Sequence, residues 1–165
     1  MTQTYHNTAG CAAAAPARTA FFAGSFNPFT VGHASVVERA LPLFDRIIIG
    51  VGVNALKADA DADARVETIR RLYRDCGSRV EVCAYQGLTV DAARNCGAGF
   101  LLRGVRSVRD FEYERDLADI NRKLSGLETI IIYTLPEHAA ISSSVVRELQ
   151  AYGHDVSSFL PQAPR

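Results

Sequence analysis

The stretch 24–33, which reads G-S-F-N-P-F-T-V-G-H, constrains the fold of this 165-residue chain more than any other. It lies between a short apolar run, 19–23, and an amphipathic run, 34–44, and this order predicts the first strand, turn and helix of an α/β domain. The two glycines of the stretch permit close backbone approach, and its proline stiffens the turn. The pattern places His33 in the first turn of the helix.

A helix that begins after such a turn is suited to bind phosphate. Its unpaired backbone N–H groups and the positive end of its dipole point at one spot, and an imidazole there donates a further hydrogen bond to a phosphoryl oxygen. A histidine in a loop is most often only a loop residue, so His33 alone is a weak signal. The whole ten-residue pattern, in its strand–turn–helix context, is more specific, and we expect a phosphate site here.

The rest of the chain alternates between predicted strands and helices. Four further segments have the apolar pattern of short strands: 46–53, 79–85, 99–102 and 128–135. Helical spacing or capping residues predict helices over 63–76, 89–95, 108–124 and 145–152. Pro42 is expected to end the first helix near Leu41. With no repeats and no long linker, the order predicts an α/β fold with one doubly wound, five-stranded parallel sheet.

Composition excludes some classes of function and bounds the domain. Lys plus Arg and Asp plus Glu both number 18, so no basic surface for nucleic acid or membrane is expected. The segment 1–18 lacks the pattern of a signal peptide and is predicted to be a flexible extension, followed by one domain over 19–165. The four cysteines, without zinc-ligand spacing, are expected to be reduced thiols of a cytoplasmic protein: Cys11, Cys76, Cys83 and Cys96.

Residues 30–33 resemble the (T/S)-x-G-H signature of the nucleotidyltransferase superfamily, in which a nucleophile attacks the α-phosphate of a nucleoside triphosphate. In an open parallel sheet the ligand crevice lies at the carboxyl ends of the strands, which brings to one rim the segments 25–33, 103–106 and 142–144, together with Lys57. These segments supply the cations, hydroxyls and helix start that a triphosphate requires. We therefore expect a Rossmann-like nucleotidyltransferase site on this rim.

Longer segments resemble the bacterial phosphopantetheine adenylyltransferase family. They are R-G-V-R-S-V-R-D-F-E-Y-E at 103–114, I-S-S-S-V-V-R-E-L at 141–149 and G-H-D-V-S-S-F-L-P at 153–161. The resemblance implies transfer of AMP from ATP to 4′-phosphopantetheine, which gives dephospho-coenzyme A and pyrophosphate in coenzyme A synthesis. It also implies Mg²⁺ bound mainly through the ATP phosphates, a homohexamer, and coenzyme A as a feedback ligand.

The resemblance also implies the roles of individual residues. The expected catalytic groups are His33 as transition-state stabiliser, Lys57 and Arg106. The expected substrate contacts are Ser25, Lys57, Thr89 and Arg103. The expected ATP contacts are Ser25, Phe26, His33, Gly104, Val105, Arg106, Glu114, His138, Ala139, Ala140, Ile141, Ser142, Ser143 and Ser144.

Some positions depart from the commoner family pattern. Ser25 stands where Thr is frequent but keeps the hydroxyl, Ala58 follows Lys57 where a second Lys is frequent, and His138 replaces a frequent aromatic. Two other functions remain open: a sister enzyme that adenylylates nicotinate mononucleotide or transfers CMP to a small phosphate, and a regulatory module that binds nucleotide without turnover. A panel of acceptors scored by pyrophosphate release separates the three.

Overall fold

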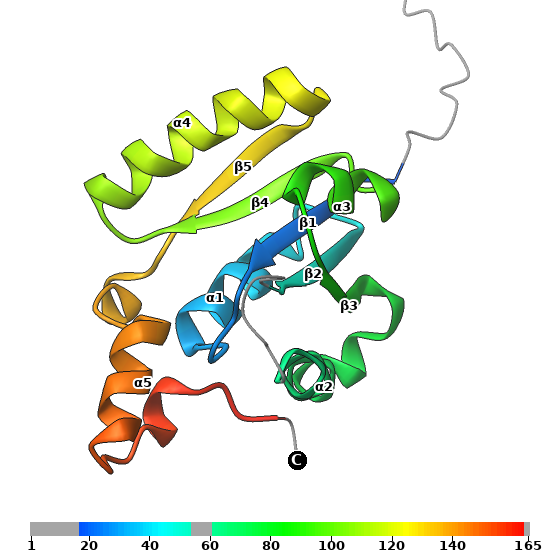
Figure 1. Cartoon of the computed structure of the whole chain (residues 1–165). Helices are drawn as coiled ribbons and strands as arrows, with labels where there is room; N and C mark the ends of the chain where they lie inside the picture. Colours follow the sequence, from blue (N-terminus) through cyan, green and yellow to red (C-terminus); the bar gives the residue numbers. More distant parts are fainter. Residues whose placement is uncertain (1–16, 54–60, 164–165) are drawn as a thin grey trace, which may run out of the picture.

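The computed structural model describes residues 17–53 and 61–163, and its centre is a five-stranded, fully parallel sheet (Figure 1). The strands are β1 (Thr19–Gly24), β2 (Arg46–Gly52), β3 (Val80–Tyr85), β4 (Phe100–Val105) and β5 (Glu128–Tyr133). Their order across the sheet is β3-β2-β1-β4-β5. This architecture confirms the predicted doubly wound sheet.

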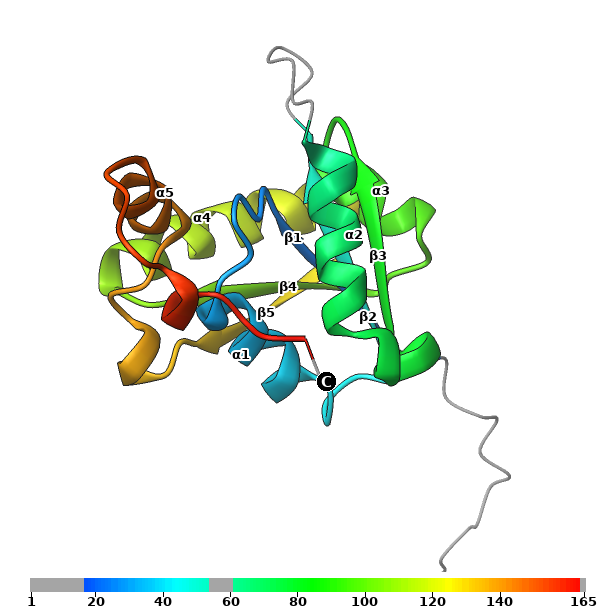
Figure 2. The same cartoon turned by 90° about the horizontal axis from the view of Figure 1, so that it is seen from below.

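Helices cover both faces of the sheet, as Figures 1 and 2 show. They are α1 (Val31–Ala40), α2 (Ala62–Leu72), α3 (Thr89–Asn95), α4 (Val108–Ser125) and α5 (Ser143–Ala151), with 3₁₀ turns at Arg74–Arg79, Pro136–His138 and Ser157–Phe159. Helices α1 and α2 pack on one face, and α3 and α4 pack on the other. None of the helices in the described part of the chain is both long and apolar enough to span a bilayer.

Successive side chains of β1 enter two separate apolar clusters. Phe22 packs with Ile49 and the α1 side chain Val37 on one face, whereas Phe21 packs with the α3 side chain Val90 on the other. Strands alternate their side chains between faces, so a strand covered on both sides needs a continuous apolar run. This is why the apolar runs of β1 and β2 predicted buried strands correctly.

The chain reverses its direction of travel across the sheet at β1. After β1 the chain passes through α1 to β2 and through α2 to β3, which lie on one side of β1. Helix α3 then leads back to β4 on the other side of β1. The connections on either side of β1 therefore leave toward opposite faces. The carboxyl ends of β1 and β4 border the crevice in which open α/β sheets bind ligands.

Several boundaries differ from the sequence predictions. Helix α1 begins at Val31 rather than at 34 and ends at Ala40, so the predicted effect of Pro42 is confirmed. Strand β4 continues past its predicted end at 102, because Arg103 and Val105 keep their register with β5. Thr89 is the first residue of α3 and not its cap; its hydroxyl contacts the Tyr85 hydroxyl at 2.8 Å. Nearly all of the predicted 1–18 extension lies outside the described residues.

Candidate active site

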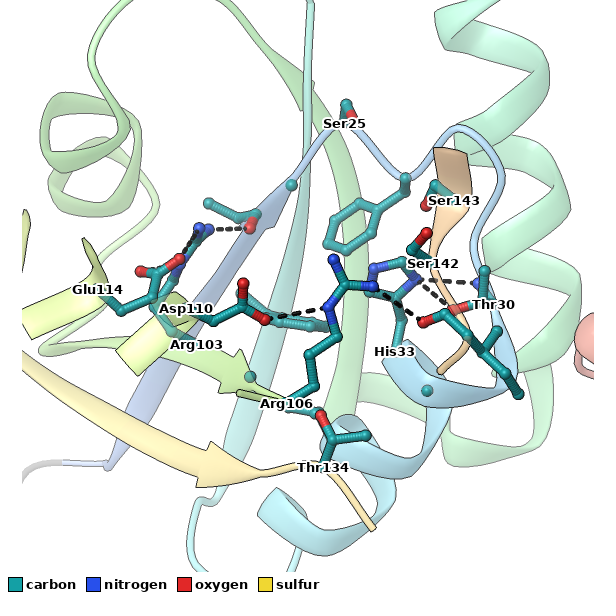
Figure 3. A pocket seen from close by; sticks show the side chains of 18 of the residues that line it. Ser25, Thr30, His33, Arg103, Arg106, Asp110, Glu114, Thr134, Ser142 and Ser143 are labelled. Atoms are coloured by element: carbon teal, nitrogen blue, oxygen red, sulfur yellow. Dashed lines mark hydrogen bonds and ion pairs between the residues drawn. The ribbon is translucent and has the colours of Figure 1, made fainter. Parts of the chain in front are cut away.

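A cavity of about 420 Å³ opens at the carboxyl ends of β1, β4 and β5 (Figure 3). It brings together three segments that are far apart in the sequence: the turn after β1, the end of β4 and the start of α5. Its lining residues include Gly24, Ser25, Phe26, Thr30, Gly32, His33, Arg103, Gly104, Arg106, Asp110, Tyr113, Glu114, Thr134, Ile141, Ser142, Ser143 and Ser144. The predicted common rim is therefore confirmed for its described segments.

His33 is the third residue of α1, and its ring is fixed by the residue that precedes the helix. Its Nδ1 accepts a hydrogen bond from the backbone N–H of Thr30 at 2.9 Å and lies 3.0 Å from the Thr30 hydroxyl oxygen. The rings of Phe26 and Phe29 pack against it, with centroids 5.2 and 5.4 Å away. Since Nδ1 is an acceptor, the proton of the neutral imidazole is on Nε2.

The surroundings of His33 also disfavour its charged form. Burial, together with the nearby positive charges of Arg106 and Arg103, lowers the pKa of His33 from 6.5 to about 4. The imidazole is thus neutral at physiological pH. A neutral ring with its proton on Nε2 is a hydrogen-bond donor for an anionic group in the cavity.

Arg103 lies on β4 with its guanidinium held at three atoms. Its Nε and Nη2 donate to the two carboxylate oxygens of Glu114 at 2.7 and 2.5 Å, and its Nη1 donates to the Ala23 carbonyl at 2.5 Å. The ion pair with Glu114 raises the pKa of Arg103 against the opposing effect of burial. Arg103 is therefore a fixed positive charge between β1 and α4.

Arg106 follows β4 and is held less tightly. Its Nε donates to Asp110 at 3.0 Å, and its Nη1 lies 3.4 Å from the Ile141 carbonyl, so it joins α4 to the segment before α5 (Figure 3). Its side chain is 40% exposed, against 26% for Arg103. An exposed guanidinium with a single ion-pair bond is free to reorient toward a bound phosphate.

The start of α5 is tied to the turn after β1. The Ser142 hydroxyl caps the helix by accepting from the Val145 N–H, and the Ser143 hydroxyl donates to the Pro28 carbonyl at 2.8 Å. Arg147 of the same helix donates to the Asn27 carbonyl. These contacts bring the N-termini of α1 and α5 to the same cavity, and both are favourable ends for an anion.

Two glycines allow the backbone to line this cavity closely. A Cβ on Gly24 would come within 2.7 Å of the Phe26 ring, which folds back over it. A Cβ on Gly104 would come within 2.8 Å of Cγ2 of Val36, so β4 and α1 approach as closely as they do only because this position lacks a side chain.

A second cavity of about 190 Å³ adjoins the first and shares Ala23 and Arg103 with it. Its other lining residues come from the start of α3, from α4 and from β1 and β4, and most are apolar: Phe21, Gly87, Leu88, Thr89, Val90, Leu101, Leu117, Asn121 and Leu124. Arg103 is thus a charged group at the junction of a polar cavity and an apolar one.

The structure separates the predicted site residues by their position relative to the two cavities. Most of them line the larger cavity, Thr89 lines the smaller one, and Arg103 lines both. Four predicted ATP contacts are not among the lining residues: Val105, His138, Ala139 and Ala140. Lys57 lies outside the described residues.

Two residues that line the larger cavity, Asp110 and Thr134, were not predicted from the sequence. Asp110 was one of many charges on a predicted exposed helix, and Thr134 follows β5 without any motif. The position of Thr134 at the end of a predicted strand was the available signal. Among the described residues, no group of three or more His, Cys, Asp or Glu is arranged to hold a metal ion.

The fold and this crevice are those of the cytidylyltransferase-like class of nucleotidyltransferases, whose family model, described as Cytidylyltransferase-like, matches residues 21–149. The crystal structure of a Vibrio parahaemolyticus protein assigned as a nicotinate-nucleotide adenylyltransferase has a TM-score of 0.61 and 17% identity, and the match covers 90% of this chain and 88% of that one. At that identity the likeness shows the fold alone.

Sequence relatives define the family within this class. The phosphopantetheine adenylyltransferase of Bacteroides thetaiotaomicron is 51% identical over 146 residues, which cover 88% of this chain and 96% of the relative. The enzyme of the same name from Phocaeicola vulgatus is 52% identical over 146 residues, with the same coverage of both chains. This chain belongs to the phosphopantetheine adenylyltransferase family.

Proposed function

We propose that this protein transfers AMP from ATP to 4′-phosphopantetheine and releases dephospho-coenzyme A and pyrophosphate, a step of coenzyme A synthesis. The observation that carries the proposal is Arg103, which joins a polar cavity containing His33 to an apolar cavity containing Thr89. A reaction between two phosphorylated molecules needs such a junction. The acceptor has a phosphate at one end and a largely apolar arm with amides behind it, which suits the smaller cavity.

In this proposal ATP occupies the larger cavity. Its phosphates lie near the N-termini of α1 and α5, with Arg106 available to bind the outer phosphates by two parallel hydrogen bonds. Ser25 and the serines 142–144 supply hydroxyl groups around the same space. On the basis of the family resemblance, we also propose that Val105 and residues 138–140 contact ATP.

The chemical step is an in-line displacement at the α-phosphorus of ATP. An oxygen of the acceptor phosphate forms a bond to the α-phosphorus while the bond to the bridging oxygen breaks, and pyrophosphate leaves with that electron pair. The second pKa of a phosphate monoester is about 6, so the nucleophile is largely dianionic at neutral pH and needs no general base. Catalysis then depends on position and on stabilisation of charge.

His33 and the arginines carry out those two tasks. The Nε2–H of His33 donates to an α-phosphoryl oxygen, whose negative charge increases in the transition state, and Arg103 holds the acceptor phosphate in line. Lys57 is a further point charge, expected at the nucleophile and the α-phosphate from the family resemblance. Arg106 stabilises the departing pyrophosphate.

Mg²⁺ fits this site as an ion carried by the ATP phosphates. Asp110 and Glu114, the two carboxylates among the described residues of the cavity, are each paired with an arginine, and magnesium commonly binds through substrate phosphates and water. When bound, the ion neutralises charge on the triphosphate.

The proposal extends to assembly, regulation and location. We propose a homohexamer from the family resemblance, supported by exposed apolar side chains along α4 at Tyr113, Ile120 and Leu124. Coenzyme A, which carries both an adenine nucleotide and a pantetheine arm, is proposed as a feedback ligand of the same two cavities. Because ATP is a cytoplasmic substrate, we place the reaction in the cytoplasm.

Pyrophosphate release from a panel of acceptors tests this function. With ATP and Mg²⁺, we expect release with 4′-phosphopantetheine and little with pantetheine, nicotinate mononucleotide or small phosphates with CTP. Release with nicotinate mononucleotide would instead identify a sister enzyme. Binding of ATP without release on any acceptor would identify a regulatory module.

A further inference from the structure

The carboxylate of Glu114 is fully engaged by one arginine. Both of its oxygens accept hydrogen bonds from Arg103, at 2.7 and 2.5 Å, and its side chain is only 8% exposed. The family resemblance assigns Glu114 to ATP. A carboxylate in direct contact with a triphosphate repels it, whereas one buried against a guanidinium does not meet it as a free charge.

The neighbouring ion pair provides a contrast within the same cavity. Asp110 lies one helical turn before Glu114 on α4 and bonds Arg106 through one oxygen at 3.0 Å, with 35% of its side chain exposed. One helix thus presents a carboxylate to each arginine at the end of β4 (Figure 3). The Asp110–Arg106 pair is partly exposed and has one hydrogen bond, whereas the Glu114–Arg103 pair is more buried and has two.

We infer that Glu114 is the positioning residue of Arg103: it fixes the guanidinium so that the remaining N–H groups meet the phosphate of the acceptor. The inference rests on the proposed function and refines it, because it assigns Glu114 to the acceptor side and not to ATP. Arg106, whose partners among the described residues are Asp110 and the Ile141 carbonyl, remains the arginine of the ATP side.

The donor count of Arg103 supports this division of roles. A guanidinium has five N–H donors. Glu114 takes one on Nε and one on Nη2, and the Ala23 carbonyl takes one on Nη1, so one donor remains on each terminal nitrogen. Three anchors fix the plane of the group. The two remaining donors, which have no partner among the described residues, lie in a fixed plane and are available to oxygens of a phosphate.

Charge and position predict opposite effects when Glu114 is neutralised. Glu114→Gln leaves Arg103 without a countercharge, and the added net positive charge alone favours a phosphate. The same change removes the bidentate anchor, so the guanidinium is free to turn and must be ordered again when the acceptor binds. If Glu114→Gln binds the acceptor more weakly although its site is more positive, the role of Glu114 is to position Arg103.

The test compares three variants with the wild type. Glu114→Gln removes the charge, Glu114→Asp keeps the charge but is one methylene too short to keep both bonds, and Asp119→Asn is the matched control on the exposed side of α4. The measurements are KM for 4′-phosphopantetheine, kcat, and calorimetric binding of ATP and of 4′-phosphopantetheine to each protein. Thermal melting confirms that each variant is folded.

For Glu114→Gln we expect KM and the dissociation constant for 4′-phosphopantetheine to rise by about tenfold, the loss of roughly one charge-assisted hydrogen bond, with ATP binding within about twofold. Glu114→Asp should restore part of the acceptor affinity, and Asp119→Asn should leave the affinity for both ligands unchanged. In an Arg103→Ala background, Glu114→Gln should have little further effect on the acceptor, since the two residues act as a unit.

Two results overturn the inference. Weaker ATP binding with unchanged acceptor binding would make Glu114 an ATP ligand, and tighter acceptor binding would make it only a countercharge. The calorimetric arm separates this inference from the proposed function. If the wild type binds 4′-phosphopantetheine without turnover, the proposed function fails, but the binding data for the Glu114 variants still test the inference. If the wild type does not bind the acceptor at all, the proposed function and the inference both fail.

Discussion

At the residue scale, the chemistry of the site depends on which nitrogen of His33 carries a proton. The Thr30 backbone N–H uses the lone pair of Nδ1, and burial between aromatic rings opposes a second proton. The family motif predicts a histidine here, but it does not say which nitrogen faces the ligand. That information comes from the hydrogen bond within the turn.

The pKa of His33 gives the first prediction. We expect NMR titration of the imidazole to give a pKa of about 4 in the folded protein, well below the unfolded value near 6.5. Because the folded state then binds fewer protons than the unfolded state between these values, this group's contribution to stability is fully present above pH 6.5 and is lost as the pH falls toward 4. In His33→Asn this part of the pH dependence should disappear. A measured pKa of 6 or higher would contradict the buried, neutral ring.

The second prediction concerns the rate. His33→Ala should lower kcat by at least about a hundredfold with a small change in ATP affinity, because the proposed hydrogen bond from His33 to the α-phosphoryl oxygen strengthens chiefly in the transition state. His154→Ala, at an exposed position near the C-terminus, is the matched control and should leave kcat unchanged. Stopped-flow and steady-state kinetics measure both. A loss of ATP affinity with kcat intact would show that His33 only binds.

At the element scale, the site exists because β4 and α1 approach each other closely at Gly104. Gly104→Ala should destabilise the protein by about 1–3 kcal/mol, because the new Cβ would lie 2.8 Å from Cγ2 of Val36. Urea unfolding measures the change. The double variant Gly104→Ala/Val36→Ala should lose less stability than the sum of its two single variants, since the second change makes room for the first. Gly99→Ala, where a Cβ would meet nothing within 4 Å, is the control.

Elements with a continuous apolar run were predictable from the sequence, and those that change environment along their length were less so. The isoleucines of β2 predicted a buried strand, and the strand is there. The predicted strand at 99–102 stopped short because Arg103 and Gly104 interrupt the run, yet the ladder to β5 continues through both. Charge and the lack of a side chain are requirements of the site at those two positions, and local propensity gives no sign of them.

The roles of the acidic residues on α4 were the least predictable part of the site. From the charge pattern alone, Asp110 and Glu114 are two of many charges on a helix predicted to be exposed, and the family resemblance singled out only Glu114, as an ATP contact. Only the packing of α4 against β4 reveals that Glu114 is buried and that each residue faces a different arginine. A contact between residues of two elements depends on how those elements pack, which the helical period alone does not specify.

At the scale of the whole molecule, the apolar stripe on α4 predicts association of copies of this chain. Tyr113, Ile120 and Leu124 are 64%, 53% and 61% exposed on one long helix. If the proposed hexamer forms through this stripe, Ile120→Glu should shift the protein to smaller species in light scattering, because a carboxylate in an apolar interface is costly. Arg115→Glu, on a polar position of the same helix, should leave the mass unchanged. A wild type that is monomeric at all concentrations would contradict the assembly.

The arrangement of the whole molecule places two cavities side by side with Arg103 between them, and the proposed reaction forms a bond between their two ligands. Phosphorus NMR of the wild type with ATP, Mg²⁺ and 4′-phosphopantetheine observes that bond most directly. We expect the signals of a new unsymmetrical diphosphate, which joins AMP to the acceptor, to grow in step with those of pyrophosphate. Conversion of ATP to AMP or ADP without that diphosphate, or a spectrum that does not change, would contradict the proposed reaction.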